Sequence, residues 1–253
     1  MRWDPTGVIY GVRPVMEALR AIPERIEKIY VRAGRNVPEE LHTLARQQNV
    51  EIVAVAEEII IRLCRSMKHQ GVAAHLSAGG QVPVTEVDDL IARTGHGPAL
   101  WFVLDGIEDP RNCGAILRTA DAVGANGVIM PNRRAVGLTA TVAKTSAGAL
   151  LHLPVCQVIN LSMAIDRLKA AEVWIVGLSE QATTCYWDFD FRTPVALVLG
   201  REGGGLHNKV RRRCDAEVRV PMQGHVGSLN VSVAAALVAY EAMRQRRGTP
   251  SET

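Results

Sequence analysis

The sequence predicts an α/β protein in two parts, because strand-like and helix-like stretches alternate along most of its 253 residues. From residue 99 onward the strand-like stretches are continuous apolar runs, which are typical of a parallel sheet covered by helices on both faces. Two clusters that contain Gly and Pro, at 77–83 and 94–98, indicate a connection between the parts. We therefore expect a small α/β domain at 1–77, a linker at 78–98, a parallel-sheet domain at 99–247 and a disordered tail at 248–253.

The first alternating series is short, but it is long enough for a small independent domain. Its apolar stretches predict strands at 8–11, 26–32, 51–56 and 71–77. The amphipathic stretches between them predict a helix that ends near Arg20, a helix near 38–48 and a helix that ends near Arg65.

The second series predicts a larger sheet with helices between its strands. Strands are expected at 99–105, 127–130, 154–158, 173–178, 195–200 and 217–221. Helices are expected at 112–124, near 139–149, near 161–170, near 206–212 and at 231–243.

The composition is that of an ordinary globular protein, with 47% hydrophobic and 22% charged residues. No apolar run reaches the ~18 residues that a membrane span needs, and the N-terminus lacks a signal-peptide pattern. The five cysteines are scattered without a CxxC pair, and the histidines lack metal-ligand spacing. We therefore expect no membrane association, no disulfide framework, no metal site and a cytoplasmic location. The net charge of +3 is compatible with a nucleic-acid partner but does not by itself indicate one.

Ligands of open α/β sheets gather at the carboxyl ends of strands, and three such ends carry unusual residues. The first reads DGIEDPRNCGAILR, at 105–118. Asn112 is expected to cap the helix that follows, and Gly114 lies one turn before Arg118, away from the apolar ridge. This glycine leaves room for a bulky ligand to approach the guanidinium. A surface arginine beside a tight helix crossing has the same pattern, so this stretch alone leaves both interpretations open.

The second strand end reads LVLGREGGGL, in which Glu202 lies among four glycines that allow a ligand close to the backbone. The spacing differs from the dinucleotide fingerprint GxGxxG, and no Gly-Lys-Ser/Thr follows as in a P-loop. A glycine-rich turn without a ligand is the alternative.

The third strand end leads into GSLNVSVAAAL, at 227–237, where a mostly apolar helix opens with three polar side chains. One interpretation is that Ser228 is simply the N-cap, which would account for one of them. Asn230 and Ser232 would then lie inside the helix, where their side chains compete with the backbone for hydrogen bonds. Three polar groups in one turn therefore indicate a lined pocket.

Together, these three stretches resemble the sequence motifs of the SpoU (TrmH-type) branch of the SPOUT methyltransferases. Residues 112–120 resemble N-x-G-A-I-x-R-T-A, 197–205 resemble L-V-L-G-x-E-G-x-G, and 221–234 resemble P-M-x-G-x-V-x-S-L-N-V-S-V-A. Near the N-terminus, IYGVRPVMEAL resembles the start of the family's substrate-binding domain, a fold shared with small RNA-binding ribosomal proteins. The resemblance covers the chain from Val8 to Arg246 and is strongest to bacterial 23S rRNA guanosine-2′-O-methyltransferases.

The resemblance implies transfer of a methyl group from S-adenosylmethionine to a ribose 2′-hydroxyl of RNA. It also implies a homodimer with active sites near the subunit interface, and a C-terminal trefoil knot, which ordinary sheet connections almost never form. The cofactor would lie in the knot, held largely by backbone groups. By position, the residues that would bind it are Leu178, Ser179, Leu199, Gly200, Val220, Met222, Ser228 and Leu229.

The family assigns activation of the 2′-hydroxyl to the arginine of the first motif, here Arg118. An arginine is a poor general base because its pKa exceeds about 12. We therefore expect Arg118 to bind phosphate and stabilise the developing alkoxide, while the proton passes to RNA phosphate or water. The neighbours expected to orient Arg118 and the ribose are Asn112, Glu202, Ser228 and Asn230.

Several rival functions remain at this stage. Within the family, a tRNA ribose methyltransferase competes with an rRNA enzyme, but tRNA enzymes tend to lack an N-terminal domain of this kind. A resistance-type rRNA methyltransferase has similar domain order. A non-catalytic RNA-binding homologue would not need to keep Arg118, Glu202 and Asn230. A nucleotide-dependent oxidoreductase would need an early GxGxxG with an acidic partner, which this chain lacks.

Overall fold

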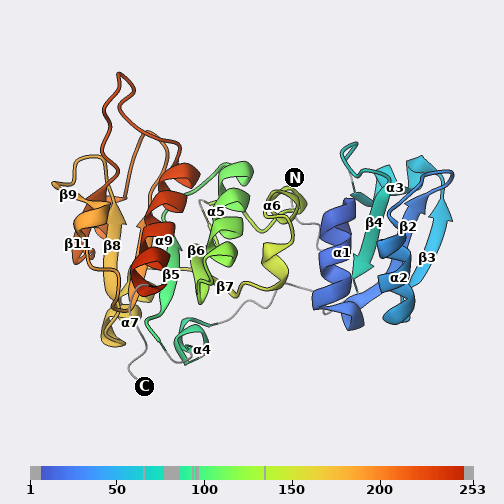
Figure 1. Ribbon diagram of the computed structural model, residues 1–253, viewed down its shortest axis with the longest axis horizontal. Coiled ribbons are helices and arrows are strands. Elements are labelled where there is room, and N and C mark those ends of the chain that lie inside the picture. Colours follow the sequence, from blue (N-terminus) through green and yellow to red (C-terminus); the bar gives the residue numbers. More distant parts are fainter. Residues whose placement is uncertain are drawn as a thin grey trace. The chain divides into compact units, whose positions relative to one another are not determined.

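Contacts within the computed structural model divide the chain into two compact units, which are described separately (Figure 1). The first unit comprises residues 1–82 and 137–152, and the second comprises 83–136 and 153–253. The residues that the structure describes are 7–64, 66–76, 86–92, 94, 97–133 and 135–247. The tail expected at 248–253 and much of the expected linker lie outside these residues.

In the first unit, one small sheet separates two hydrophobic clusters. Its strand order is β1-β4-β2-β3, with β2 and β3 parallel and the other neighbours antiparallel. The bounds are β1 Val8–Tyr10, α1 Val12–Ala21, η1 Pro23–Arg25, β2 Ile26–Arg32, α2 Glu39–Gln47, β3 Glu51–Val55, α3 Glu57–Cys64 and β4 Val72–Leu76. Helices α1 and α2 cover one face of the sheet, where Leu19 and Leu41 pack in one cluster with Ile29. Helix α3 covers the other face, where Ile60 packs in one cluster with Tyr10. This order of elements agrees with the alternation read from the sequence.

A segment from the middle of the sequence is grouped with the first unit. It contains α6 (Ala140–Thr145), which contacts β1, and the 3-10 turn η2 (Ala149–Leu151). Lys144 Nζ lies 5.8 Å from the centroid of the Tyr10 ring and donates to the carbonyl of Lys68, 76 positions away in the sequence. The helix expected near 139–149 is shorter than predicted, because Ala147 and Gly148 turn the backbone to positive φ. This grouping rests on contacts between residues far apart in the sequence, which the alternation of strands and helices does not reveal. The domain boundaries expected from the sequence stay a prediction.

The second unit contains the predicted parallel sheet, whose strand order is β7-β6-β5-β10-β8-β11-β9. The strands are β5 Leu100–Leu104, β6 Gly127–Pro131, β7 Val155–Val158, β8 Trp174–Leu178, β9 Thr184–Cys185, β10 Val195–Leu199 and β11 Ala216–Arg219. The helices are α4 Val87–Ala92, α5 Pro110–Ala122, α7 Leu161–Ala170, η3 Tyr186–Asp188, α8 Asn208–Arg211 and α9 Val231–Arg247. Among the described residues, no helix is both long and apolar enough to span a membrane.

Both faces of this sheet are buried, as the continuous apolar runs predict. On one face, Trp101 and Val103 of β5 pack with α7 through Ile165 and Leu168. The alternate strand residues, such as Phe102, are also fully buried. Helices α5 and α9 lie side by side against the sheet, with α5 in contact with β6 and α9 in contact with β10 (Figure 1). The central strands β5 and β10 therefore hold a rigid platform from which their carboxyl-end loops extend.

The stretch expected to be a linker contains a packed helix. Helix α4 buries Val87 and Leu90 in the same core as Trp101. A Cβ atom at Gly127 would lie 2.4 Å from Leu90 Cδ1, so the absence of a side chain at Gly127 lets Leu90 reach the sheet. The helix is too short to give a periodic signal, which explains why the sequence did not indicate it.

Replacing Leu90 with Ala is expected to lower the free energy of unfolding by about 2–5 kcal/mol, because it leaves a cavity in a closed core. Urea unfolding followed by circular dichroism measures the change. The matched control is Ile159→Ala, because Ile159 is 88% exposed and its loss should cost less than about 0.5 kcal/mol. Equal small effects in the two variants would contradict a structural role for α4.

Candidate functional site

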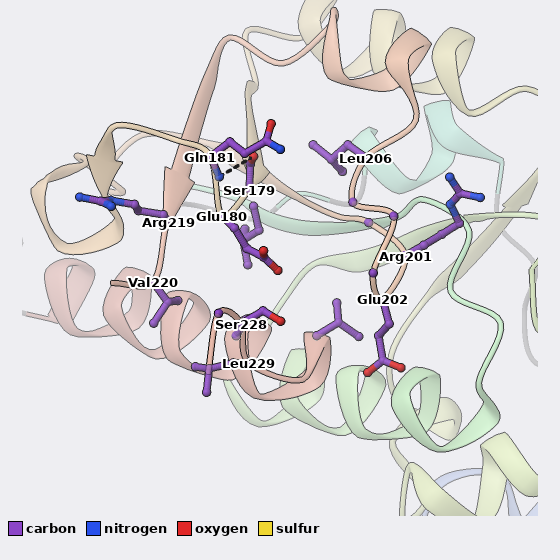
Figure 2. Close-up of a pocket in the computed structure, with 18 of the residues that line it drawn as sticks. Ser179, Glu180, Gln181, Arg201, Glu202, Leu206, Arg219, Val220, Ser228 and Leu229 are labelled. Atoms are coloured by element: carbon purple, nitrogen blue, oxygen red, sulfur yellow. Dashed lines mark hydrogen bonds between the residues drawn. The ribbon is translucent and has the colours of Figure 1, made fainter. Parts of the chain in front are cut away.

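A cavity of about 530 Å³ lies at the carboxyl ends of β8, β10 and β11 (Figure 2). The volume falls within the range of roughly 300–1,000 Å³ common for small-molecule sites, and ligands of open α/β sheets gather at this edge. The wall is formed by residues from four segments distant in the sequence, 178–181, 200–206, 218–222 and 227–234, together with Arg211. Strand order, and not sequence order, brings these segments together.

The glycine-rich loop after β10 is a tight turn that forms one wall of the cavity. Arg201 N donates to Gly205 O at 3.0 Å, and Gly205 N donates to Arg201 O at 2.9 Å. Gly203 and Gly205 have positive φ, and a Cβ atom at Gly200 would lie 2.3 Å from the carbonyl carbon of Gly205. The glycines are therefore required by the turn itself, and they also leave backbone groups open toward the cavity.

The base of this loop is fixed by a buried carboxylate. Asp105 follows β5 and is only 5% exposed. Its Oδ2 accepts from the His207 backbone N at 2.7 Å, and its Oδ1 lies 2.8 Å from His207 Nδ1. Sequence reasoning did not select Asp105 or His207 as site residues. The available signal was an aspartate at the end of the apolar run ALWFVLD, because a buried carboxylate needs hydrogen-bond partners.

Three of the sequence-selected residues meet in one hydrogen-bonded group. Asn230 Nδ2 donates to Asn112 Oδ1 at 3.0 Å and to Glu202 Oε1 at 2.7 Å. Asn230 Oδ1 accepts from Ser232 N at 2.9 Å and from Ser232 Oγ at 2.6 Å. One amide thus joins α5, the glycine-rich loop and the start of α9. Asn230, at the start of the last helix, is therefore a junction between segments, and Ser232 holds its side-chain oxygen.

Neither helix is capped by the residue that the sequence suggested for it. Helix α5 begins at Pro110 and is capped by Asp109, whose Oδ1 accepts from Arg111 N at 2.8 Å. Asn112 is therefore inside the helix, where its side chain is free to turn toward Asn230. Helix α9 begins at Val231, and Asn230, not Ser228, accepts from its first turn. In both places, a different polar residue near the start of the helix accepts the hydrogen bond from its first turn.

Arg118 stands apart from this group. It is exposed on α5, and within the described part of the chain it has no hydrogen bond or ion pair. It is not among the residues that line the cavity, whereas Glu202, Ser228 and Asn230 are. The guanidinium is thus available to a ligand that approaches α5 from outside.

Of the eight residues expected to bind a cofactor, seven line the cavity: Leu178, Ser179, Gly200, Val220, Met222, Ser228 and Leu229. Leu199 does not. It is fully buried in β10, and its carbonyl accepts from Asp105 N at 2.7 Å. The expectation for Leu199 is therefore not met, whereas its neighbour Gly200 lines the cavity as expected.

A cysteine nucleophile is excluded at this position on α5. Cys113, next to Asn112, is fully buried, and burial raises the pKa of its thiol to about 12. A thiol with this pKa is protonated at neutral pH and does not act as a nucleophile or as a base.

Two families match most of the chain. Residues 99–240 match the SpoU rRNA Methylase family, and residues 8–79 match the family described as RNA 2′-O ribose methyltransferase substrate binding. The first match covers more than half of the chain and includes the three segments that carry Asn112, Glu202 and Asn230.

Individual relatives are similar over nearly the full length. The 23S rRNA (guanosine-2′-O-)-methyltransferase RlmB of Bordetella pertussis is 43% identical over 247 residues, which cover 96% of this chain and 99% of the relative. The protein of the same name from Xylella fastidiosa is 40% identical over 240 residues, covering 94% and 96%. Among solved structures, the SpoU methyltransferase AviRb from Streptomyces viridochromogenes in complex with the cofactor AdoMet has a TM-score of 0.79 at 28% identity, covering 95% and 90%.

Substitutions at Asn230 can separate two roles of its side chain: capping α9 and joining α9 to Asn112 and Glu202. Asn230→Ala removes both and is expected to lower the free energy of unfolding by about 1–3 kcal/mol. Asn230→Asp keeps a good cap but loses both donors and places a second carboxylate against Glu202, so it should also destabilise. Adding Glu202→Gln to Asn230→Asp should recover part of the loss. Urea unfolding measures all three variants, and an Asn230→Asp protein as stable as the wild type would show that only the cap matters.

Proposed function

This chain belongs to the SpoU rRNA methylase family, and we propose from this that it transfers a methyl group from S-adenosylmethionine to the ribose 2′-hydroxyl of a guanosine in 23S rRNA. The protein is an RNA 2′-O-methyltransferase that uses S-adenosylmethionine. The observation that carries this proposal is 43% identity, over nearly all of both chains, to a relative with this activity in its name. The hydrogen-bonded group of Asn112, Glu202 and Asn230 beside the cavity supports the proposal that this activity lies there.

The cavity fits the cofactor in size and in chemistry. Its volume of about 530 Å³ is sufficient for a nucleoside carrying an amino-acid chain. Four glycines of the loop at 200–205 leave backbone N–H and C=O groups in the wall, and these suit the hydrogen-bonding edges of a nucleoside. The apolar side chains of Leu178, Val220 and Leu229 suit the flat faces of a base. When bound, the cofactor supplies a methyl group that its sulfonium already makes electrophilic.

The protein's own residues must position the ribose oxygen and help it to lose its proton. Positioning in line with the methyl group can contribute about 7–11 kcal/mol in favourable cases. We assign Arg118 to phosphate binding and to stabilisation of the developing alkoxide, because its guanidinium is exposed and unpaired within the described residues. A guanidinium has only N–H donors and no acceptor, which makes it unsuitable as the base, so the proton passes to RNA phosphate or water. Asn112, Glu202, Ser228 and Asn230 orient the ribose and the loop that faces it.

Residues 8–79 match a substrate-binding family, and we assign RNA binding to the first unit on this basis. The relative that is 43% identical over nearly the full length carries 23S rRNA in its name, and this favours rRNA over tRNA. Other relatives of similar coverage carry both tRNA and rRNA in their names. An enzyme that modifies rRNA works where ribosomes are made, so we place the protein in the cytoplasm. The trefoil knot expected of the family stays a prediction.

A homodimer is the proposed assembly, and an exposed apolar stripe supports it. Helix α9 exposes Val233 (47%), Leu237 (38%) and Tyr240 (47%), which follow one another at helical spacing. Together with Tyr186 they line a shallow hollow of about 400 Å³. Contiguous apolar surface of this kind is typical of protein interfaces. Because α9 contacts α5, a dimer formed through this stripe lies close to the helix that carries Arg118.

Removal of the Arg118 guanidinium is expected to lower turnover on the order of 10²–10³-fold in Arg118→Ala. Arg118→Lys should recover little of this turnover, because the ammonium of a lysine is a point charge and cannot form the two parallel hydrogen bonds of a guanidinium. The measurement is transfer of radiolabelled methyl to 23S rRNA, with the modified ribose mapped by its resistance to alkaline cleavage. Cofactor binding should stay unchanged, since Arg118 does not line the cavity.

The control for this test is Arg192→Lys, because Arg192 is paired with Asp190 on the surface. Near-normal turnover of Arg118→Lys would remove the need for a guanidinium. A wild-type protein that binds the cofactor but methylates only tRNA would overturn the rRNA assignment, and one that methylates no RNA would support a non-catalytic homologue.

Introducing a charge in the apolar stripe is expected to dissociate the dimer. Leu237→Glu places a carboxylate at the centre of the stripe, where burial against a second copy would leave it unpaired. Analytical ultracentrifugation should show a dimer for the wild type and a monomer for this variant. Ile159→Glu, at a position 88% exposed and away from the stripe, should remain dimeric. A monomeric wild type, or a dimer unaffected by Leu237→Glu, would refute this interface.

A further inference from the structure

The cavity wall contains charged side chains that the proposed roles of the site residues do not use. They are Glu180, Arg201, Arg211 and Arg219. Their arrangement decides which charge a ligand meets inside the cavity.

The three arginines are either neutralised or turned away. Arg211 Nε donates to Glu217 Oε1 at 2.7 Å, and its Nη1 donates to Gln181 Oε1 at 3.1 Å. Figure 2 shows the side chains of Arg201 and Arg219 directed away from the middle of the cavity, on opposite sides. Arg201 lies along its own loop, since its Nη2 is 3.1 Å from the position that a Cβ of Gly204 would take.

Of the two carboxylates in the cavity wall, one is hydrogen-bonded and the other is not. Glu202 is engaged by Asn230 at 2.7 Å. Glu180, which follows β8, has no hydrogen bond or ion pair with any residue that the structure describes. Its carboxylate points toward the middle of the cavity, between the glycine-rich loop and the turn that carries Ser228 (Figure 2). A ligand in the cavity therefore faces one uncompensated negative charge.

We propose that Glu180 selects the positively charged methyl donor over the neutral product and so favours product release. This inference rests on the proposed function. S-Adenosylmethionine and S-adenosylhomocysteine share their adenosine and amino-acid groups and differ at the sulfur, which is a sulfonium in the donor and an uncharged thioether in the product. The carboxylate of Glu180 attracts the sulfonium and gains nothing comparable from the thioether. The cavity thus binds the donor more tightly before transfer and loses that attraction when the methyl group leaves.

The test is calorimetric titration of the full-length protein with three ligands: S-adenosylmethionine, S-adenosylhomocysteine and sinefungin, which carries an amine where the donor has its methylsulfonium. In Glu180→Gln we expect the dissociation constants of the donor and of sinefungin to rise about tenfold, because a charge interaction inside a cavity has been removed. The constant for S-adenosylhomocysteine should change less than about twofold, and its retained binding shows that the cavity is still folded. The matched control is Glu86→Gln, an exposed carboxylate outside the cavity wall, which should alter none of the three.

Equal weakening of all three ligands would overturn the proposal, because it would show that Glu180 contacts the ribose or the amino-acid group that they share. Unchanged binding of all three would also overturn it. Failure of the wild type to bind any of the ligands would instead refute the proposed function, so the two failures are distinguishable.

Discussion

The side-chain amide of Asn230 joins segments that lie up to 118 positions apart in the sequence. Its nitrogen donates to Asn112 on α5 and to Glu202 in the glycine-rich loop, while its oxygen holds the first turn of α9. Asn112 is only 7% exposed, so its oxygen would lose its partner without Asn230. No hydrophobic contact could replace this junction, because only an amide offers two donors and an acceptor within one planar group.

The opposite end of the same loop is fixed by Asp105. This carboxylate accepts from the backbone of His207 and lies beside its imidazole, while its own N–H donates to Leu199. The loop at 200–206 is therefore held at its base by the central strand β5 and at its tip by α9. Between these two attachments, its glycines form the cavity wall. The cavity is thus a consequence of polar contacts between loops that a rigid apolar sheet brings to one edge.

The sheet itself was predictable because its signal is local. Continuous apolar runs of β5, β8 and β10 give both the strands and their parallel arrangement, and the helices between them follow from periodicity. The three sequence motifs also led to the residues of the junction. Contacts between distant residues were not predictable in this way. Neither the packing of α4 into the core nor the grouping of α6 with the first unit has a periodic signature, and the pairing of Asp105 with His207 spans 102 positions. The two helix caps were misassigned because each helix start offers more than one capping side chain, and tertiary contacts decide between them.

The junction also connects the cavity to the helix that carries Arg118. Asn112 and Arg118 are six residues apart on α5, a distance of about 9 Å along a helix axis. Because α5 is continuous from Pro110 to Ala122, fixing Asn112 fixes the axial position and rotation of Arg118 as well. The same Asn230 amide sets the position of Glu202 in the cavity wall. In the proposed function, a donor in the cavity and an RNA phosphate at Arg118 would therefore be placed relative to one another through a single hydrogen-bonded group. Since in-line transfer depends on that relative placement, we propose that the junction contributes to catalysis even where its members do not touch the reacting atoms.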